Sequence, residues 1–552
     1  MFADLHCHPS NRSFNLIRNA SGDPLTQQHP PGSLPFNKTI WYLSPDDVKF
    51  KKKEQTKGYT ATMGAYPQCD VASLTNADVR LVFAALYPIE KGFVSGNRRK
   101  GISAKSASAA IKMILRRKRL GWLGKILAIP LAGVDMIVSM FVNSKGPVRD
   151  WVQAMIMRLE PGRIDFFQKA RYDYFAEMQY ERWLYEYGDG QQPPPGVNKY
   201  HLVKDNDHLR SVIEGTGDIA VVQTFEGMHM LSQQSNSSGD PVYVGWDTLK
   251  DRILQIKNWN IFFATFSHHY DNSLAGHARS LPELLQEITD QVPRRHAGFQ
   301  HNPGQALKDG DGMKAARLLL SLSDSLQTDP ALGKRILIDL KHMAARARKE
   351  YYDEIIEPYN AAHPNDKIPV IASHVGYANI KTLDDLISRA DFEHDESFLN
   401  SFYQWNINLC DEDVQVIVES GGIIGLSFDQ RIIGIDLATT PQSSGSWSWY
   451  LANNIFAFAR ACIDAPMNNP YRVWDCIGLG TDFDGFIDPV DPFATSERFG
   501  FFMSELLKRF EELGEATRRY LGLLGNPYTP YEVIEKIAFK NAYQFALRNF
   551  KP

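Results

Sequence analysis

The sequence contains eight short apolar runs rich in β-branched residues, and each is followed by a polar cluster and then a helical pattern. Their hydrophobicity is continuous rather than alternating, which is typical of strands buried on both faces of a parallel sheet. The runs are Phe2–His8, Val79–Pro88, Ile219–Glu226, Ile261–His268, Arg335–His342, Ile368–His374, Gly422–Phe428 and Cys476–Asp482. The helical patterns include Trp246–Trp259, Met313–Leu326, Ala344–Ala362 and Glu412–Ser420. Eight strands alternating with helices predict an α/β fold, a (β/α)8 TIM barrel.

The spacing between the runs is uneven, which bears on the domain organisation. A chain of 552 residues would contain three or four domains at about 150 residues each, but barrels often exceed that size. Residues 89–218 and 275–331 are much longer than a βα unit needs. We interpret both as insertions that form a cap or an oligomer contact. We therefore expect one barrel domain, 1–552, that assembles as a homo-oligomer.

Charge, cysteine content and the N-terminal residues narrow the class of protein. Lys and Arg total 60 against 64 for Asp and Glu, a net charge of −4, which gives no support to nucleic-acid binding through bulk charge. The five cysteines form no CxxC pair, so neither a disulfide scaffold nor a cysteine-type zinc finger is indicated. The segment Met1–His8 lacks the basic start and apolar run of an export signal, which predicts a cytoplasmic protein.

One segment of the first insertion is a candidate attachment surface. The mostly apolar stretch Gly121–Val142 follows the basic run Arg116–Arg119. A transmembrane helix is not expected, because charged residues such as Lys125 and Asp135 interrupt the stretch. Two interpretations stay open: a peripheral membrane contact, or a helical hairpin packed on the barrel or on a second subunit. In both, residues 102–142 serve attachment or assembly rather than the active site.

The ends of the predicted strands carry an unusual set of side chains. In a barrel these ends lie on one face, where such enzymes keep their active sites. Histidine accounts for 15 of 552 residues, so five histidines at strand ends are not expected by chance. The residues at these positions are His6, His8, Glu226, His268, His342, His374 and Asp482.

These residue types suit a site for two divalent metal ions. His6 and His8 are two residues apart on a strand and therefore point the same way, and the Glu226 carboxylate can bridge two cations. His342 and His374, from adjacent strands, can complete the second metal. Nitrogen and carboxylate ligands favour Zn²⁺ first, with Mn²⁺ or Fe²⁺ as alternatives. Such a metal pair ionises a water molecule and polarises a carbonyl group.

Asp482 is the carboxylate left over by this assignment. A carboxylate beside an activated water can take its proton and deliver it to the leaving group. We therefore expect Asp482 to handle the proton.

Six short motifs follow one another along the chain in a characteristic order. They are DLHCH at 4–8, FEGMH at 225–229, TFSH at 265–268, IDLKH at 338–342, VIASH at 370–374 and GLGTDFDG at 478–485. In this order they resemble the membrane (renal) dipeptidase family of the amidohydrolase superfamily. The run FKN at 539–541 resembles that family's closing motif, so the resemblance spans nearly the whole chain, with insertions.

The resemblance implies a metal-dependent hydrolase that cleaves an amide bond of a small, dipeptide-like substrate with water activated by two metals. It also implies a role for each residue of the set. His6 and His8 match ligands of the first metal, Glu226 the bridging carboxylate, His342 and His374 ligands of the second metal, His268 the histidine that contacts substrate and stabilises the tetrahedral intermediate, and Asp482 the catalytic aspartate.

Two departures from the family pattern affect the expected substrate. His8 stands where the family usually has an aspartate, and no arginine follows His374 to hold a substrate carboxylate. An arginine fork is the natural carboxylate clamp, so its absence predicts weak activity on dipeptides with a free C-terminal carboxylate. A strong preference for the free acid would instead mean that another cation, such as Arg294, Arg295 or Arg431, replaces it.

Two alternatives to amide hydrolysis stay open. The same metal pair would support hydrolysis of a lactone, an ester or another carbonyl compound. The chain could also be a non-catalytic, membrane-associated relative, against which the complete set of metal-competent side chains argues.

Overall fold

The computed structural model describes residues 1–17, 39–41, 67–90, 172–236, 241–280, 307, 310–388, 398–399, 402–435, 444–485, 487 and 489–552. All eight predicted strands lie in one parallel sheet, in the order β1-β2-β4-β7-β8-β9-β12-β13. Their bounds are β1 Phe2–Cys7, β2 Val79–Leu86, β4 Ile219–Glu226, β7 Phe263–Thr265, β8 Leu337–Asp339, β9 Ile371–Val375, β12 Ile423–Leu426 and β13 Ile477–Leu479.

The two edges of this sheet meet and nearly close it. Cys7 forms a parallel bridge with Phe483. The backbone N–H of Asp482 donates to the carbonyl of His6 over 2.9 Å, and that of His8 donates to Phe483 over 2.9 Å. The first strand thus pairs with the chain that follows the last one. The prediction of a (β/α)8 barrel is confirmed.

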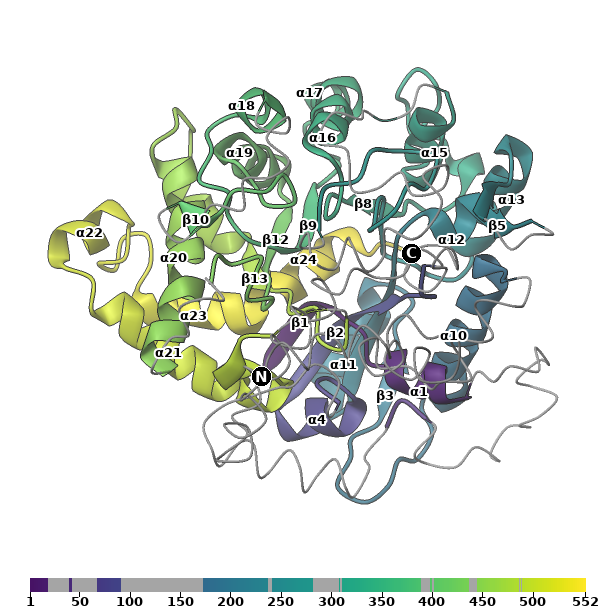
Figure 1. Cartoon of the computed structure of the whole chain (residues 1–552). Helices are drawn as coiled ribbons and strands as arrows, with labels where there is room; N and C mark the ends of the chain where they lie inside the picture. Colours follow the sequence, from purple (N-terminus) through teal and green to yellow (C-terminus); the bar gives the residue numbers. More distant parts are fainter. Residues whose placement is uncertain are drawn as a thin grey trace, which may run out of the picture.

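Helices surround the strands, as Figure 1 shows. They are α1 Asn11–Ile17, α4 Val71–Asn76, α10 Tyr174–Gly188, α11 Asn206–Gly215, α12 His229–Ser232, α13 Trp246–Lys257, α15 Asp311–Leu319, α16 Ala345–Tyr351, α17 Glu357–Ala362, α18 Leu383–Ser388, α19 Asp411–Ser420, α20 Ser444–Ile463, α21 Phe499–Glu511, α22 Glu515–Tyr520, α23 Pro530–Glu535 and α24 Asn541–Asn549. The four predicted helical patterns correspond to α13, α15, α16 with α17, and α19, although α15 ends at Leu319, seven residues before the predicted end. With helices outside and side chains inside, both faces of the strands are covered, and every residue of β4 is buried.

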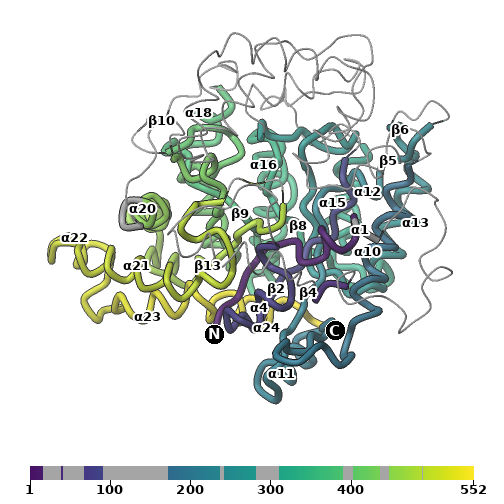
Figure 2. Tube along the Cα trace, turned by 60° about the horizontal axis from the view of Figure 1, so that its bottom comes forward, coloured from purple at the N-terminus to yellow at the C-terminus, as the bar shows by residue number. Residues whose placement is uncertain are grey.

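The C-terminal helix packs near the start of the chain, where Figure 2 shows α24 beside the N-terminus and β13. The π-helical turn Lys536–Lys540 leads into α24, and Asn541 is the first residue of α24. The Asn541 amide donates to the carbonyls of Trp474 and Ile477, each over 2.8 Å. The asparagine of the FKN run therefore fixes the last helix to the start of β13.

Several strands end earlier than the sequence predicts. β7 ends at Thr265 and β8 at Asp339, each three residues before the predicted end. For β8, and for β13, which ends at Leu479, the backbone accounts for the early end: His342 has a φ of 65° and Asp482 a φ of 59°, in the left-handed region outside strand geometry. The chain leaves the sheet before it reaches these side chains.

The described parts of the two predicted insertions contain regular structure. Residues 172–218 include α10, α11 and the short strand β3 Tyr200–Leu202, which pairs in parallel with β4 off the barrel path. Residues 102–142, the candidate attachment surface, lie outside the described residues, so that prediction and the interpretation as insertions stay predictions. Among the helices that the structure describes, each is too short or too polar to cross a membrane.

Candidate active site

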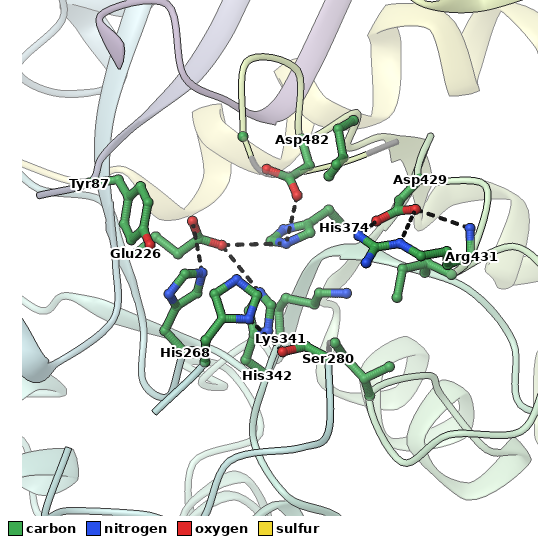
Figure 3. A pocket seen from close by; sticks show the side chains of 15 residues that line it. Tyr87, Glu226, His268, Ser280, Lys341, His342, His374, Asp429, Arg431 and Asp482 are labelled. Atoms are coloured by element: carbon green, nitrogen blue, oxygen red, sulfur yellow. Dashed lines mark hydrogen bonds and ion pairs between the residues drawn. The ribbon is translucent and has the colours of Figure 1, made fainter. Parts of the chain in front are cut away.

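All seven residues predicted from the strand ends meet at one face of the barrel, and Figure 3 shows five of them around the pocket there. Six are almost fully buried: His6 at 0%, His8 at 1%, Glu226 at 2%, His268 at 3%, His342 at 4% and His374 at 1% exposure. The Asp482 side chain is 13% exposed and lines the pocket. Glu226, His268, His342 and His374 also line the pocket, but Asp482 is the most exposed member of the set.

The Glu226 carboxylate lies among five imidazoles, four of which are candidate metal ligands. Its Oε1 is 3.3 Å from His6 Nε2, 3.4 Å from His342 Nε2 and 3.4 Å from His374 Nε2. Its Oε2 is 3.3 Å from His8 Nε2. Two groups of candidate ligands share this carboxylate: one also contains His6, His8 and Asp482, and the other also contains His342 and His374.

These separations fit a metal centre. Ligands about 2.0–2.1 Å from a tetrahedral zinc ion lie about 3.3 Å from one another. Within the described residues, both ring nitrogens of His6, His8 and His342 are buried without a hydrogen-bond partner, as are His374 Nε2 and Glu226 Oε1. Buried polar atoms are normally satisfied. A converging set of unsatisfied ligand atoms is therefore what a cation site requires, and the residues present fit divalent metals.

The electrostatics of the cluster also favour cations. Burial alone would raise the pKa of Glu226, but the surrounding imidazoles hold it well below its usual range. Burial, together with neighbouring positive charge, holds the pKa values of His342 and His374 well below their ordinary value. For Glu226, His342 and His374 these are the forms that bind metals, an ionised carboxylate and neutral imidazoles. At His8, burial lowers the pKa, but Asp482 and Glu226 raise it well above its ordinary value.

Asp482 lies close to the candidate metal ligands as well as to the pocket. Its Oδ1 lies 3.2 Å from His8 Nε2, so the carboxylate reaches the first group of candidate ligands as well as the pocket. Its left-handed backbone turns the side chain toward the cluster. A Cβ on Gly485 would lie 2.2 Å from Asp482 Oδ1, so only glycine leaves room for this carboxylate. Strained backbone of this kind is concentrated at functional sites.

Buried carboxylates beneath the cluster hold the strands that carry it. Asp4 accepts hydrogen bonds from the backbone N–H of His6 over 3.2 Å and of Thr481 over 3.0 Å. Burial raises the pKa of Asp4 to about 6. Asp339 accepts one from the Ser373 hydroxyl over 2.7 Å. Sequence reasoning missed both residues, although an aspartate inside an otherwise apolar run was a usable signal.

Glu90 is a second residue that sequence reasoning missed. Its Oε2 lies 2.6 Å from His268 Nδ1, and its Oε1 accepts a hydrogen bond from the Tyr270 N–H over 3.1 Å. The other ring nitrogen of His268, Nε2, is 3.4 Å from Glu226 Oε2. Burial lowers the pKa of His268, but Glu226 and Glu90 raise it more. Glu90 therefore sets which way the His268 ring faces. It follows the second strand by only a few residues, beyond the predicted end at Pro88.

We expect Glu90→Gln to lower kcat/KM by about 10²-fold, because a misplaced catalytic group can cost that much. The amide has one acceptor oxygen where the carboxylate has two, so it cannot accept from both the His268 ring and the Tyr270 N–H, and it leaves the ring without its anionic partner. Steady-state kinetics check this, with metal content measured alongside. Unchanged kinetics at full metal content would mean that Glu90 only supports the fold, whereas recovery in Glu90→Asp would identify the carboxylate as the required group.

The remaining wall of the pocket combines polar and apolar side chains. It is formed by His269, Ser280, Lys341, Ile407, Asp429, Arg431, Ile432 and Ile487. The Arg431 Nε donates to Asp429 Oδ1 over 3.0 Å, and a second guanidinium nitrogen donates to the other carboxylate oxygen. Of the arginines proposed as substitutes for the missing clamp, Arg431 thus lies at the pocket, and Arg294 and Arg295 lie outside the described residues. Sequence reasoning missed Lys341.

No protein-family model matches the sequence, and no curated protein matches it either. Among solved structures, the chain is similar to dipeptidase AC, a metallopeptidase of peptidase family M19, with 11% identity and a TM-score of 0.46 over 92% of this chain and 95% of that one. A metallopeptidase from Rhodobacter sphaeroides, bound to a phosphinate mimic of the dipeptide L-Ala-D-Ala, gives 11% identity and a TM-score of 0.46 over 91% and 95%. The probable dipeptidase PvdM from Pseudomonas aeruginosa gives 13% identity and a TM-score of 0.38 over 92% and 99%.

Proposed function

We propose that the protein is a metal-dependent hydrolase that cleaves an amide bond in a small, dipeptide-like molecule. One observation carries the proposal: four buried imidazoles share one carboxylate at the spacing of metal ligands, beside a pocket that a second carboxylate enters. His6, His8, Glu226, His342 and His374 would hold two divalent cations, zinc first. When bound, such ions polarise a carbonyl group and acidify water.

The side chains of the pocket supply the remaining chemistry. Asp482 is partly exposed, so its carboxylate can take a proton from the attacking water and give it to the leaving amine. His268, oriented by Glu90, can donate from Nε2 to the carbonyl oxygen as negative charge develops on it. Ile407, Ile432 and Ile487 give this wall an apolar surface that would limit access of bulk water to the reacting bond.

A substrate screen tests this proposal. The metal-loaded protein is incubated with dipeptides, N-acyl amino acids and lactones, and each product is quantified. We expect hydrolysis of amides, and we expect none from Glu226→Gln protein purified in the same way, which controls for a contaminating hydrolase. Faster turnover of lactones than of any amide would favour the carbonyl-hydrolase alternative. A protein that binds metal but hydrolyses nothing in the panel would contradict the proposal.

The number of metal ions is a separate prediction. We expect two divalent ions per chain, because four imidazoles and a shared carboxylate exceed what one tetrahedral ion needs. Elemental analysis of protein purified under metal-replete conditions measures this ratio. A ratio of one or less would contradict the assignment of two ligand groups.

A further inference from the structure

Lys341 is a buried cation for which the proposed reaction has no use. Its residue exposure is 2%, and its ammonium nitrogen, Nζ, has no hydrogen-bond partner among the described residues. It nevertheless lines the pocket. Figure 3 shows its side chain extending from beside His342 toward the part of the pocket where Arg431 lies. A buried ammonium without a direct partner is costly unless a ligand completes it.

The surroundings of Lys341 decide what such a ligand would be. Burial lowers the pKa of Lys341 to about 8, although Asp482, Asp429, Glu226 and Asp339 favour its charged form. None of these carboxylates forms an ion pair with Lys341 in the described part of the chain. Arg431 is already held by Asp429, which neutralises its charge. Among the described residues that line this wall, Lys341 is thus the cation without a direct anionic partner, and its three N–H donors suit an anionic oxygen ligand.

Lys341 lies next to a candidate metal ligand, so its positive charge is near the bond that would be cleaved. Lys341 immediately precedes His342, and its charge acts on both His342 and His374. A carbonyl group placed at the ligand cluster would thus have the ammonium on one side of it. Ser280 and Arg431 line the same pocket.

We propose that Lys341 binds a carboxylate of the substrate and so selects amides that carry a carboxylate close to the scissile bond. This inference rests on the proposed function. It assigns the task of the missing arginine to a residue in another place, at the end of β8. The inference predicts a preference for the free acid, whereas the sequence analysis predicts weak activity on free acids. One experiment therefore decides between the two predictions.

The experiment compares a dipeptide with its C-terminal amide, in wild-type and Lys341→Met protein. Methionine keeps the length of the side chain and removes its charge. We expect wild-type kcat/KM to favour the free acid by about 10–100-fold, the worth of a charge-assisted hydrogen bond. Lys341→Met should lose that preference and keep its activity on the amide. Lys250→Met, at an exposed position of α13, is the matched control and should retain the preference.

Binding separates failure of this inference from failure of the proposed function. Both compounds are titrated by calorimetry into metal-loaded Asp482→Asn protein, with and without Lys341→Met, and metal content is measured for each variant. We expect the acid to bind at least about tenfold more tightly than the amide, and only when Lys341 is present. This result supports the inference even if neither compound is hydrolysed. Equal binding of acid and amide, or a preference that survives Lys341→Met at full metal content, would overturn it.

Discussion

Replacing Asp482 with asparagine lowers the turnover number by about 10²–10⁴-fold, the usual worth of a general acid–base group. The side chain keeps its shape and one oxygen atom, but the amide cannot take up and return a proton. Asp482 suits this task because it is the carboxylate of the site that is 13% exposed, whereas the Glu226 side chain is 3% exposed. Its left-handed backbone, with a φ of 59°, keeps it at the pocket.

Turnover and metal content must be measured together for this variant. We expect the metals to stay, because Glu226 and four imidazoles remain and the asparagine oxygen can occupy the same place. Asp247→Asn, at an exposed position of α13, is the matched control and should behave as wild type. Near wild-type turnover would mean that a residue other than Asp482 transfers the proton. Loss of metal would instead make Asp482 a ligand, a role that its 3.2 Å separation from His8 Nε2 permits.

Replacing Glu226 with glutamine removes the metals themselves. Its carboxylate oxygens lie 3.3–3.4 Å from a nitrogen of each of His6, His8, His342 and His374, so a single substitution affects both groups of ligands. Even partners that only support a ligand are worth about 10–100-fold in metal affinity, and we expect at least that loss here. The neutral amide also leaves the cations without the anionic charge at the centre of the cluster.

Equilibrium dialysis against metal buffers, followed by elemental analysis, measures this effect. Glu354→Gln, an exposed glutamate beyond α16, is the control and should bind metal as wild type does. The melting temperature gives a second readout, since a bound ion stabilises only the folded state. A chelator should lower the melting temperature of the wild type and leave that of Glu226→Gln nearly unchanged. Full metal occupancy in Glu226→Gln would contradict the bridging role.

The residues that sequence reasoning missed have a common physical reason. Lys341 and Glu90 carry no pattern of their own, because a lone charged residue next to a strand is most often solvated. Their roles depend on which side chains the fold places beside them. The role of Glu90 becomes visible only in the 2.6 Å contact between its Oε2 and His268 Nδ1. That contact joins residues that follow different strands, β2 and β7, and local sequence contains no information about it.

What the sequence by itself determined is the barrel and the composition of its reactive face. Continuous apolar runs specify strands buried on both sides, and parallel strands of a barrel must end at one face, so His6, Glu226 and His374 could be placed together without coordinates. Only the tertiary structure decided how these side chains converge. The left-handed backbone of His342 and Asp482 arises from the packing of all strands at once, and so does the buried ammonium of Lys341, which has no hydrogen-bond partner among the described residues. Burial and spacing of this kind exist only in the folded chain.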